Sequence, residues 1–90
     1  MAIITAQLKD GFSCEIDEAA IDDNFELVEA YAAAQRGEPA GIVDVVDIVL
    51  GDENKRALKE HLRATNGRIS AASMFAAVNE LVAATKSGKK

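Results

Sequence analysis

Tryptophan is absent from this 90-residue sequence, and cysteine, histidine and proline occur once each. The single cysteine, Cys14, cannot form a disulfide within the chain, and together with one histidine it cannot complete the four ligands of a structural zinc site. Three Phe, one Tyr and a net charge of −5 argue against a nucleic-acid-binding protein, because phosphate contacts need a basic surface and exposed bases stack on aromatic rings. We therefore expect no nucleic-acid partner and no bound metal or cofactor.

Long apolar runs are also missing. The most apolar stretch, residues 42–50, contains Asp44 and Asp47 and is far shorter than the roughly 20 residues that a membrane span requires. The first residues, Met-Ala-Ile-Ile-Thr, lack the basic start and apolar middle of a signal peptide, so we expect no membrane association and a cytoplasmic location. With 49% hydrophobic and 28% charged residues, the chain predicts one compact domain over residues 1–85.

Alternating apolar residues predict a β-hairpin over about residues 3–16. A two-residue turn at Asp10 and Gly11 would mix apolar and polar side chains on each face of the hairpin. A three-residue turn with Gly11 in the left-handed conformation places all apolar side chains on one face. The pairs in that register are Leu8 with Phe12, Ala6 with Cys14 and Ile4 with Ile16.

Two helices are predicted after the hairpin, at residues 24–36 and 39–50. Asp23 and Glu26 have the spacing of a capping box, and Gly37 is a natural left-handed stop. For the first helix we expect a buried stripe of Phe25, Val28 and Ala32, with Leu27 and Tyr31 beside it. The second helix begins with Pro39 and ends at Gly51. Its Asp44 and Asp47 would lie on one solvent-facing edge of a helix but on opposite faces of a strand, which favours the helix.

Two further helices are predicted at residues 53–65 and 71–85. Asp52 is the expected cap of the first, Leu58 and Leu62 its inward residues, and Asn66-Gly67 its end. In the second, Ile69 is positioned to pack on Met74 as a hydrophobic staple, and residues 86–90 form a flexible basic tail. The predicted fold class is therefore α+β, an N-terminal β-hairpin followed by four α-helices packed as a small helical domain.

Catalytic chemistry has little support in the sequence. His61 is the single imidazole, and Glu60 next to it points about 100° away on a helix, so it cannot orient the ring. Cys14 faces inward in the predicted register and is interpreted as a small buried hydrophobe. The acids between residues 17 and 26 lack the oxygen-ligand spacing and central glycine of an EF-hand loop. We therefore predict no catalytic, cofactor-binding or metal-binding residues and no enzymatic activity.

Two surfaces are candidates for contact with a partner protein. The first is a basic stripe, since Lys55, Lys59 and Arg63 recur at every fourth residue of a predicted helix. It contacts an acidic partner, is balanced by acids of the same chain such as Glu26 and Glu29, or is simply a solvated face of the helix. The second is the apolar face of the last helix, which is either core or an accessible surface for another helix. The candidate partner-binding residues on this face are Met74, Phe75, Val78 and Leu81.

Over about residues 3–82, the order of these sequence segments resembles that in the tail assembly chaperones of long-tailed bacteriophages and prophages. The segments that carry the resemblance are DGFSCEID at 10–17, DDNFEL at 22–27, GEP at 37–39, LGDE at 50–53, LKEHLR at 58–63 and GRIS at 67–70, before Met74. None of them is a catalytic signature.

The resemblance implies a non-enzymatic protein in the host cell cytoplasm that binds the tape measure protein and keeps its apolar helices soluble during tail tube assembly. The major tail tube protein and further copies of the chain itself are the other partners that we expect on this basis. The alternative is a small structural protein of the mature phage particle, such as a head–tail connector or tail subunit. Mass spectrometry of purified particles separates the two, because a chaperone should be absent from them.

Overall fold

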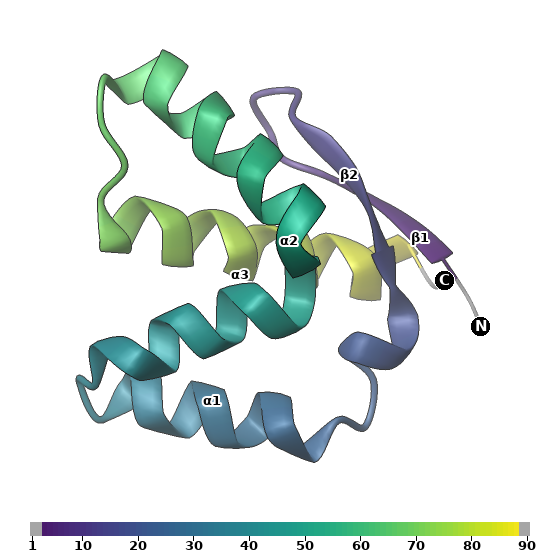
Figure 1. Cartoon of the computed structure of the whole chain (residues 1–90). Coiled ribbons are helices and arrows are strands. Elements are labelled where there is room, and N and C mark those ends of the chain that lie inside the picture. Colours follow the sequence, from purple (N-terminus) through teal and green to yellow (C-terminus); the bar gives the residue numbers. More distant parts are fainter. Residues whose placement is uncertain (1–2, 89–90) are drawn as a thin grey trace.

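The computed structural model describes residues 3–88 and places a two-stranded sheet against a set of helices (Figure 1). Strands β1 (Ile3–Gln7) and β2 (Ser13–Asp17) are followed by a short 3₁₀ helix, η1 (Glu18–Ala20). The helices α1 (Phe25–Gln35), α2 (Pro39–Asn66) and α3 (Ala71–Gly88) complete the chain. The α+β class and the N-terminal hairpin are confirmed, whereas the expected four α-helices are three.

The hairpin has the predicted register. Ile4 pairs with Ile16 and Ala6 with Cys14, the Leu8 N–H donates to the Phe12 carbonyl at 2.7 Å, and Gly11 has a φ of 105°. Ala6, Leu8 and Ile16 are buried. A left-handed Gly11 thus fixes a turn in which the apolar side chains share the inner face.

Helix α1 begins one residue later than the capping box predicts. Asn24 is the N-cap, and its side-chain oxygen accepts a hydrogen bond from the Glu26 N–H at 3.1 Å. Asp23 instead has a φ of 53°, a left-handed conformation that Asp tolerates better than most residues and that turns the chain into the helix. At the other end, Gly37 (φ 86°) stops α1 as predicted, with the Glu38 N–H bonded to the Ala33 carbonyl as in a Schellman motif.

The expected buried stripe of α1 is wrong for Phe25 and Val28 and confirmed for Leu27. Phe25 and Val28 are 72% and 60% exposed, whereas Leu27 and Ala30 are buried. Helix α1 lies against the first part of α2 so closely that a Cβ at Gly41 would come within 2.3 Å of the Ala34 nitrogen. Because only small side chains permit such an approach, the alanine-rich face of α1 packs on α2 and the larger Phe25 and Val28 point outward.

Helix α2 unites the two helices expected at residues 39–50 and 53–65, so that prediction is corrected to one element with a break. At Gly51 the backbone leaves the helical region (φ 74°, ψ 178°), in a conformation that is essentially restricted to glycine. Gly67 (φ 82°) ends α2 as expected. We call residues 39–50 the N-terminal half of α2 and residues 52–66 its C-terminal half; the two run in different directions (Figure 1).

Helix α3 begins after Ser70, whose Oγ accepts a hydrogen bond from the Ser73 N–H at 3.0 Å. The helix runs to Gly88, so the backbone of residues 86–88, which we expected in a flexible tail, is helical; residues 89–90 of that tail lie outside the described part. Within the described residues no helix is long and apolar enough to cross a membrane.

The core lies where the hairpin, α2 and α3 meet. Leu58, Val78 and Leu81 are fully buried there, together with Ile16 from the hairpin. Leu58 and Leu62 face inward as predicted. The same core continues across the Gly51 break, where Val45, Val46 and Val49 are buried.

Candidate functional site: an apolar groove at the break in α2

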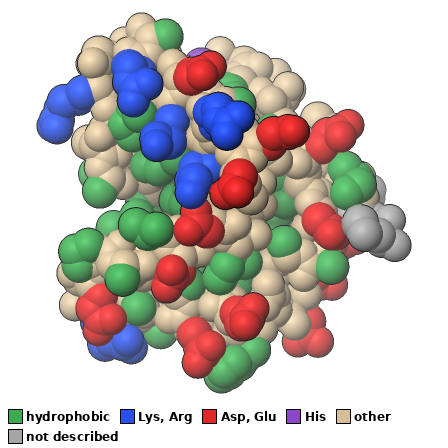
Figure 2. Space-filling view, viewed as in Figure 1, with side chains coloured by type: hydrophobic (Ala, Val, Ile, Leu, Met, Phe, Trp, Pro, Cys, Tyr) green, Lys and Arg blue, Asp and Glu red, His purple; other side chains and the backbone are tan. Residues whose placement is uncertain are grey.

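An open groove of about 310 Å³ lies between the two halves of α2 and the start of α3. We call it the α2–α3 groove. Its floor includes the buried Val46 and Met74, and its edge includes Val43, which is 55% exposed. In Figure 2 the surface is hollowed at the left, between an upper part rich in Lys and Arg and a lower part with apolar and acidic side chains. The lining residues are Ile42, Val43, Val46, Asp47, Lys55, Lys59, Ile69, Ser70, Ala71 and Met74.

The break at Gly51 produces the two walls of this groove. Residues from the N-terminal half of α2 form one wall, and Lys55 and Lys59 from the C-terminal half form the other. Across the break, Lys55 Nζ lies 2.7 Å from Asp47 Oδ1. The hydrogen bond that Lys55 Nζ donates to the Asp47 carboxylate raises the pKa of Lys55, so this lysine is charged at neutral pH and is partly neutralised by its partner.

The predicted basic stripe lies along the C-terminal half of α2. Lys55, Lys59 and Arg63 line one adjoining hollow of about 240 Å³, together with Asp52, Arg56 and Glu60. Among residues 3–88, Lys55 is the one member of the stripe that has an ion-pair partner. The structure thus brings Lys55 and Lys59 to the groove, and places Arg63 farther along the same wall.

The predicted apolar contacts of α3 are mostly core. Val78 and Leu81 are fully buried and Met74 is 7% exposed, so Val78 and Leu81 cannot touch a partner in this conformation. Phe75 is half-buried, with its ring centroid 5.9 Å from that of Tyr31. Of the four residues, Met74 alone lines the groove. The reason is that α3 buries its apolar face against the hairpin and α2, which leaves no free stripe at the expected place.

A second apolar surface surrounds the start of α1. Phe25 and Val28 line a hollow of about 290 Å³ with Ile21, Leu27, Tyr31 and Val82. Its polar neighbours are Asp23 and Asn24, so it differs in charge from the groove. The Tyr31 hydroxyl donates to Asn79 Oδ1 at 2.7 Å, which ties α1 to α3 beneath this surface.

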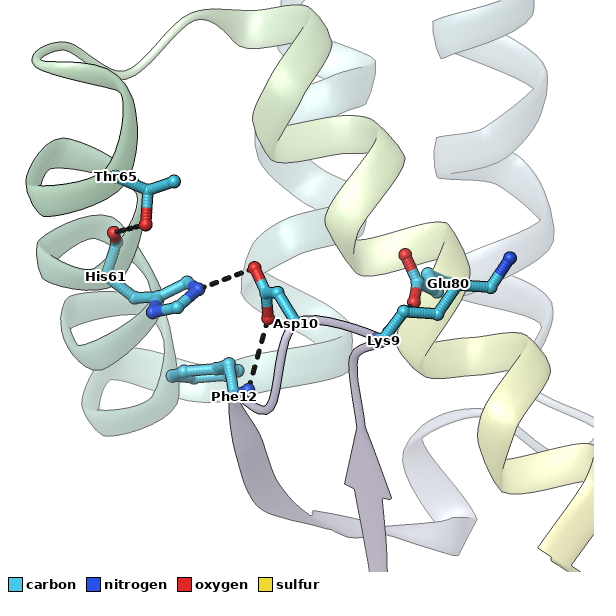
Figure 3. Close-up of polar contacts among 6 residues, drawn as sticks. All are labelled: Lys9, Asp10, Phe12, His61, Thr65 and Glu80. Atoms are coloured by element: carbon cyan, nitrogen blue, oxygen red, sulfur yellow. Dashed lines mark hydrogen bonds and ion pairs between the residues drawn. The ribbon is translucent and has the colours of Figure 1, made fainter.

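His61 has a partner that the sequence pattern does not reveal. Its Nε2 lies 2.8 Å from Asp10 Oδ2 in the hairpin turn, and its ring packs on Phe12 with centroids 5.1 Å apart (Figure 3). The Phe12 N–H also donates to Asp10. These two hydrogen bonds, that from His61 first, lower the pKa of Asp10. The pair is 51 residues apart in the chain and joins the turn to α2, so we interpret it as a structural contact.

Other reactive side chains are scattered. Cys14 is half-buried, and burial raises the pKa of its thiol, which disfavours the nucleophilic thiolate at neutral pH. Within residues 3–88, no three His, Cys, Asp or Glu side chains are grouped as metal ligands. The expected absence of an enzymatic activity stays a prediction.

Comparison with known proteins yields no match, whether against protein-family models, curated proteins or solved structures. The candidate site therefore rests on its own geometry.

Of the ten groove residues, sequence reasoning predicted Lys55, Lys59 and Met74 and missed the other seven. Three of the missed residues, Ile42, Val43 and Ile69, supply accessible apolar surface. All three are aliphatic, and periodicity alone does not separate an accessible edge from core. The signal that was available is Gly51, which follows an apolar helix and precedes another helix without a loop. Such a glycine indicates an abrupt change of direction, and the inside of the bend is where an accessible apolar surface forms.

Proposed function

We propose that this chain is a non-enzymatic tail assembly chaperone that binds the tape measure protein and keeps it soluble during tail tube assembly. The observation that carries the proposal is the α2–α3 groove, an open apolar hollow with two lysines on one wall. Its place of action would be the host cell cytoplasm. Contacts with the major tail tube protein or with further copies of the chain belong to the same proposal.

The groove has the features that recognition of a helical segment requires. An amphipathic helix buries its apolar face in a groove lined by aliphatic side chains, and polar residues at the rim fix its orientation. Here Ile42, Val43 and Ile69 are at least partly exposed at the groove. Burial of such surface would stabilise a complex by roughly 25 cal/mol for each Å² of apolar area removed from water.

Co-purification with the tape measure protein of the same gene cluster tests the proposal. Val43→Asp puts a charge at the apolar edge of the groove, and we expect it to reduce the recovered tape measure protein at least about tenfold, because an apolar contact is lost and a carboxylate must be desolvated on binding. Val28→Asp is the matched control, since Val28 and Val43 are 60% and 55% exposed but lie on different surfaces. Circular dichroism must show both variants folded.

Wild-type recovery with Val43→Asp would exclude the groove as the binding site. Loss with Val28→Asp alone would instead move the site to the surface around Phe25.

A further inference from the structure

The two walls of the α2–α3 groove differ in charge. Lys59 lies on one wall and makes no ion pair within the described residues, whereas Asp47 on the other wall is paired with Lys55. Beyond Lys59, the same wall continues into the hollow that Arg56 and Arg63 line, and neither arginine has an ion-pair partner among residues 3–88. The basic wall therefore has charge available for a partner.

Acids of the chain neutralise this wall only in part. Asp47 pairs with Lys55, and Asp52 and Glu60 line the same hollow as the arginines. Glu26 and Glu29, which we considered as intramolecular partners of the stripe, line a separate hollow with Asp44 and Asp47. Figure 2 shows most of the Lys and Arg side chains on the upper part of this face, with a few acidic ones among them, and most acidic side chains below and to the right. Arg56, Lys59 and Arg63 have no ion-pair partner among residues 3–88. Such unpaired basic side chains, on a chain with a net charge of −5, favour an acidic partner at this place.

We infer that the α2–α3 groove selects an amphipathic helix with acidic side chains along the flank that faces the C-terminal half of α2. This inference rests on the proposed function and adds the charge pattern of the helix that is bound. Lys55, Lys59 and Arg63 follow one another at four-residue steps, which places them about 6 Å apart along the wall. A partner helix that binds along this wall matches the spacing of these basic residues if its acidic residues are three or four positions apart. Its apolar stripe then covers Val43 and Met74.

The experiment uses three synthetic helical peptides with the same leucine stripe and with Glu, Gln or Lys on one flank. Fluorescence anisotropy measures their binding to the full chain at low and high salt. We expect the Glu peptide to bind about tenfold more tightly than the Gln peptide, since exposed ion pairs each contribute a few-fold. High salt should reduce this ratio, because it screens the pairs. The Lys peptide should bind most weakly.

Two charge-reversal variants locate the effect. Lys59→Glu should invert the preference, so that the Lys peptide binds more tightly than the Glu peptide. Arg68→Glu removes the same charge at an exposed position that lines neither hollow and should preserve the preference. Circular dichroism confirms that both variants are folded.

Equal affinity for the three peptides, or an equal effect of Lys59→Glu and Arg68→Glu, would overturn the inference and leave binding of apolar helices intact. The absence of any peptide binding would also overturn it, and the co-purification experiment then decides separately whether the tape measure protein is bound. Competition by a single-stranded oligonucleotide with the same salt dependence would assign the basic wall to nucleic acid instead.

Discussion

The two halves of α2 differ in almost every property although they belong to one element. The N-terminal half has two acids and no base, and it packs against the small residues of α1. The C-terminal half has four bases and three acids, buries Leu58 and Leu62 in the core, and contacts the hairpin turn through His61. A single residue, Gly51, separates them.

This difference explains why an accessible groove exists in such a small protein. A straight α2 would carry its two halves in line, with no concave surface between them. Because the backbone turns at Gly51, an apolar and acidic wall faces a basic one across a common floor. The following predictions test the packing of the first half, the break itself, and the link of the second half to the hairpin.

The largest effect is expected for Gly41→Ala in the N-terminal half. The new Cβ would lie 2.3 Å from the Ala34 nitrogen and 2.7 Å from the Ala33 carbonyl carbon, so α1 must move away from α2. We expect a loss of about 3 kcal/mol in the free energy of unfolding, measured by urea denaturation, since overpacking against backbone is poorly relieved. Ala40→Ser at the exposed neighbour should stay within about 0.5 kcal/mol of wild type. An unchanged Gly41→Ala would refute the close packing of α1 on α2.

An intermediate effect is expected for Gly51→Ala at the break. No atom crowds a Cβ there, so its cost is backbone strain alone, about 1–3 kcal/mol. Relief of the strain requires residue 51 to return to a helical conformation, which straightens α2 and removes the groove.

Gly67→Ala is the control, because it also replaces a left-handed glycine (φ 82°) at a similar cost of about 1–2 kcal/mol but leaves the two walls in place. We expect peptide binding to fall with Gly51→Ala only; equal binding by the two variants would contradict the role of the break.

The smallest effect is expected for Asp10→Asn, which weakens the contact between the hairpin turn and the C-terminal half of α2. Hydrogen bonds from His61 and Phe12 lower the pKa of Asp10 below its ordinary 3.8. A carboxylate with a lowered pKa stabilises the folded protein above the unfolded-state value, and this contribution is lost as the pH falls through the folded-state value. Wild type should therefore melt at a slightly higher temperature than Asp10→Asn at about pH 6, and the difference should vanish near about pH 2. A difference independent of pH would show that the charge of Asp10 plays no part.

Much of the local structure could be predicted from the sequence because it depends on neighbouring residues. The hairpin register follows from the parity of the apolar residues around Gly11, and the ends of α1 and α2 follow from Gly37 and Gly67. The helical nature of residues 42–49 followed from the spacing of two aspartates, despite six β-branched side chains. In each case the information lies within a few residues.

The burial of α1, the partner of His61 and the groove depend on how the helices pack. Residues close together in the sequence do not determine that packing. The spacing of Phe25 and Val28 suits a buried stripe, but the close approach at Gly41 selects the alanine face of α1 instead. Likewise, the partner of His61 is 51 residues away, and the groove requires the direction of the chain after Gly51. Of the candidate site residues, Lys55, Lys59 and Met74 reach the groove, whereas Val78 and Leu81 of the same predicted α3 face are core.

The ion pair between Asp47 and Lys55 has a consequence for following the shape of α2 in solution. In an unbroken helix, residues eight positions apart are separated by about 12 Å along the axis, too far for a carboxylate to meet an ammonium group at 2.7 Å. The pair can therefore form only while the two segments are folded toward each other. The distance between these two side chains therefore reports how strongly α2 is bent at Gly51. A ligand carboxylate that pairs with Lys55 in place of Asp47 would remove one contact that holds the two halves at this angle.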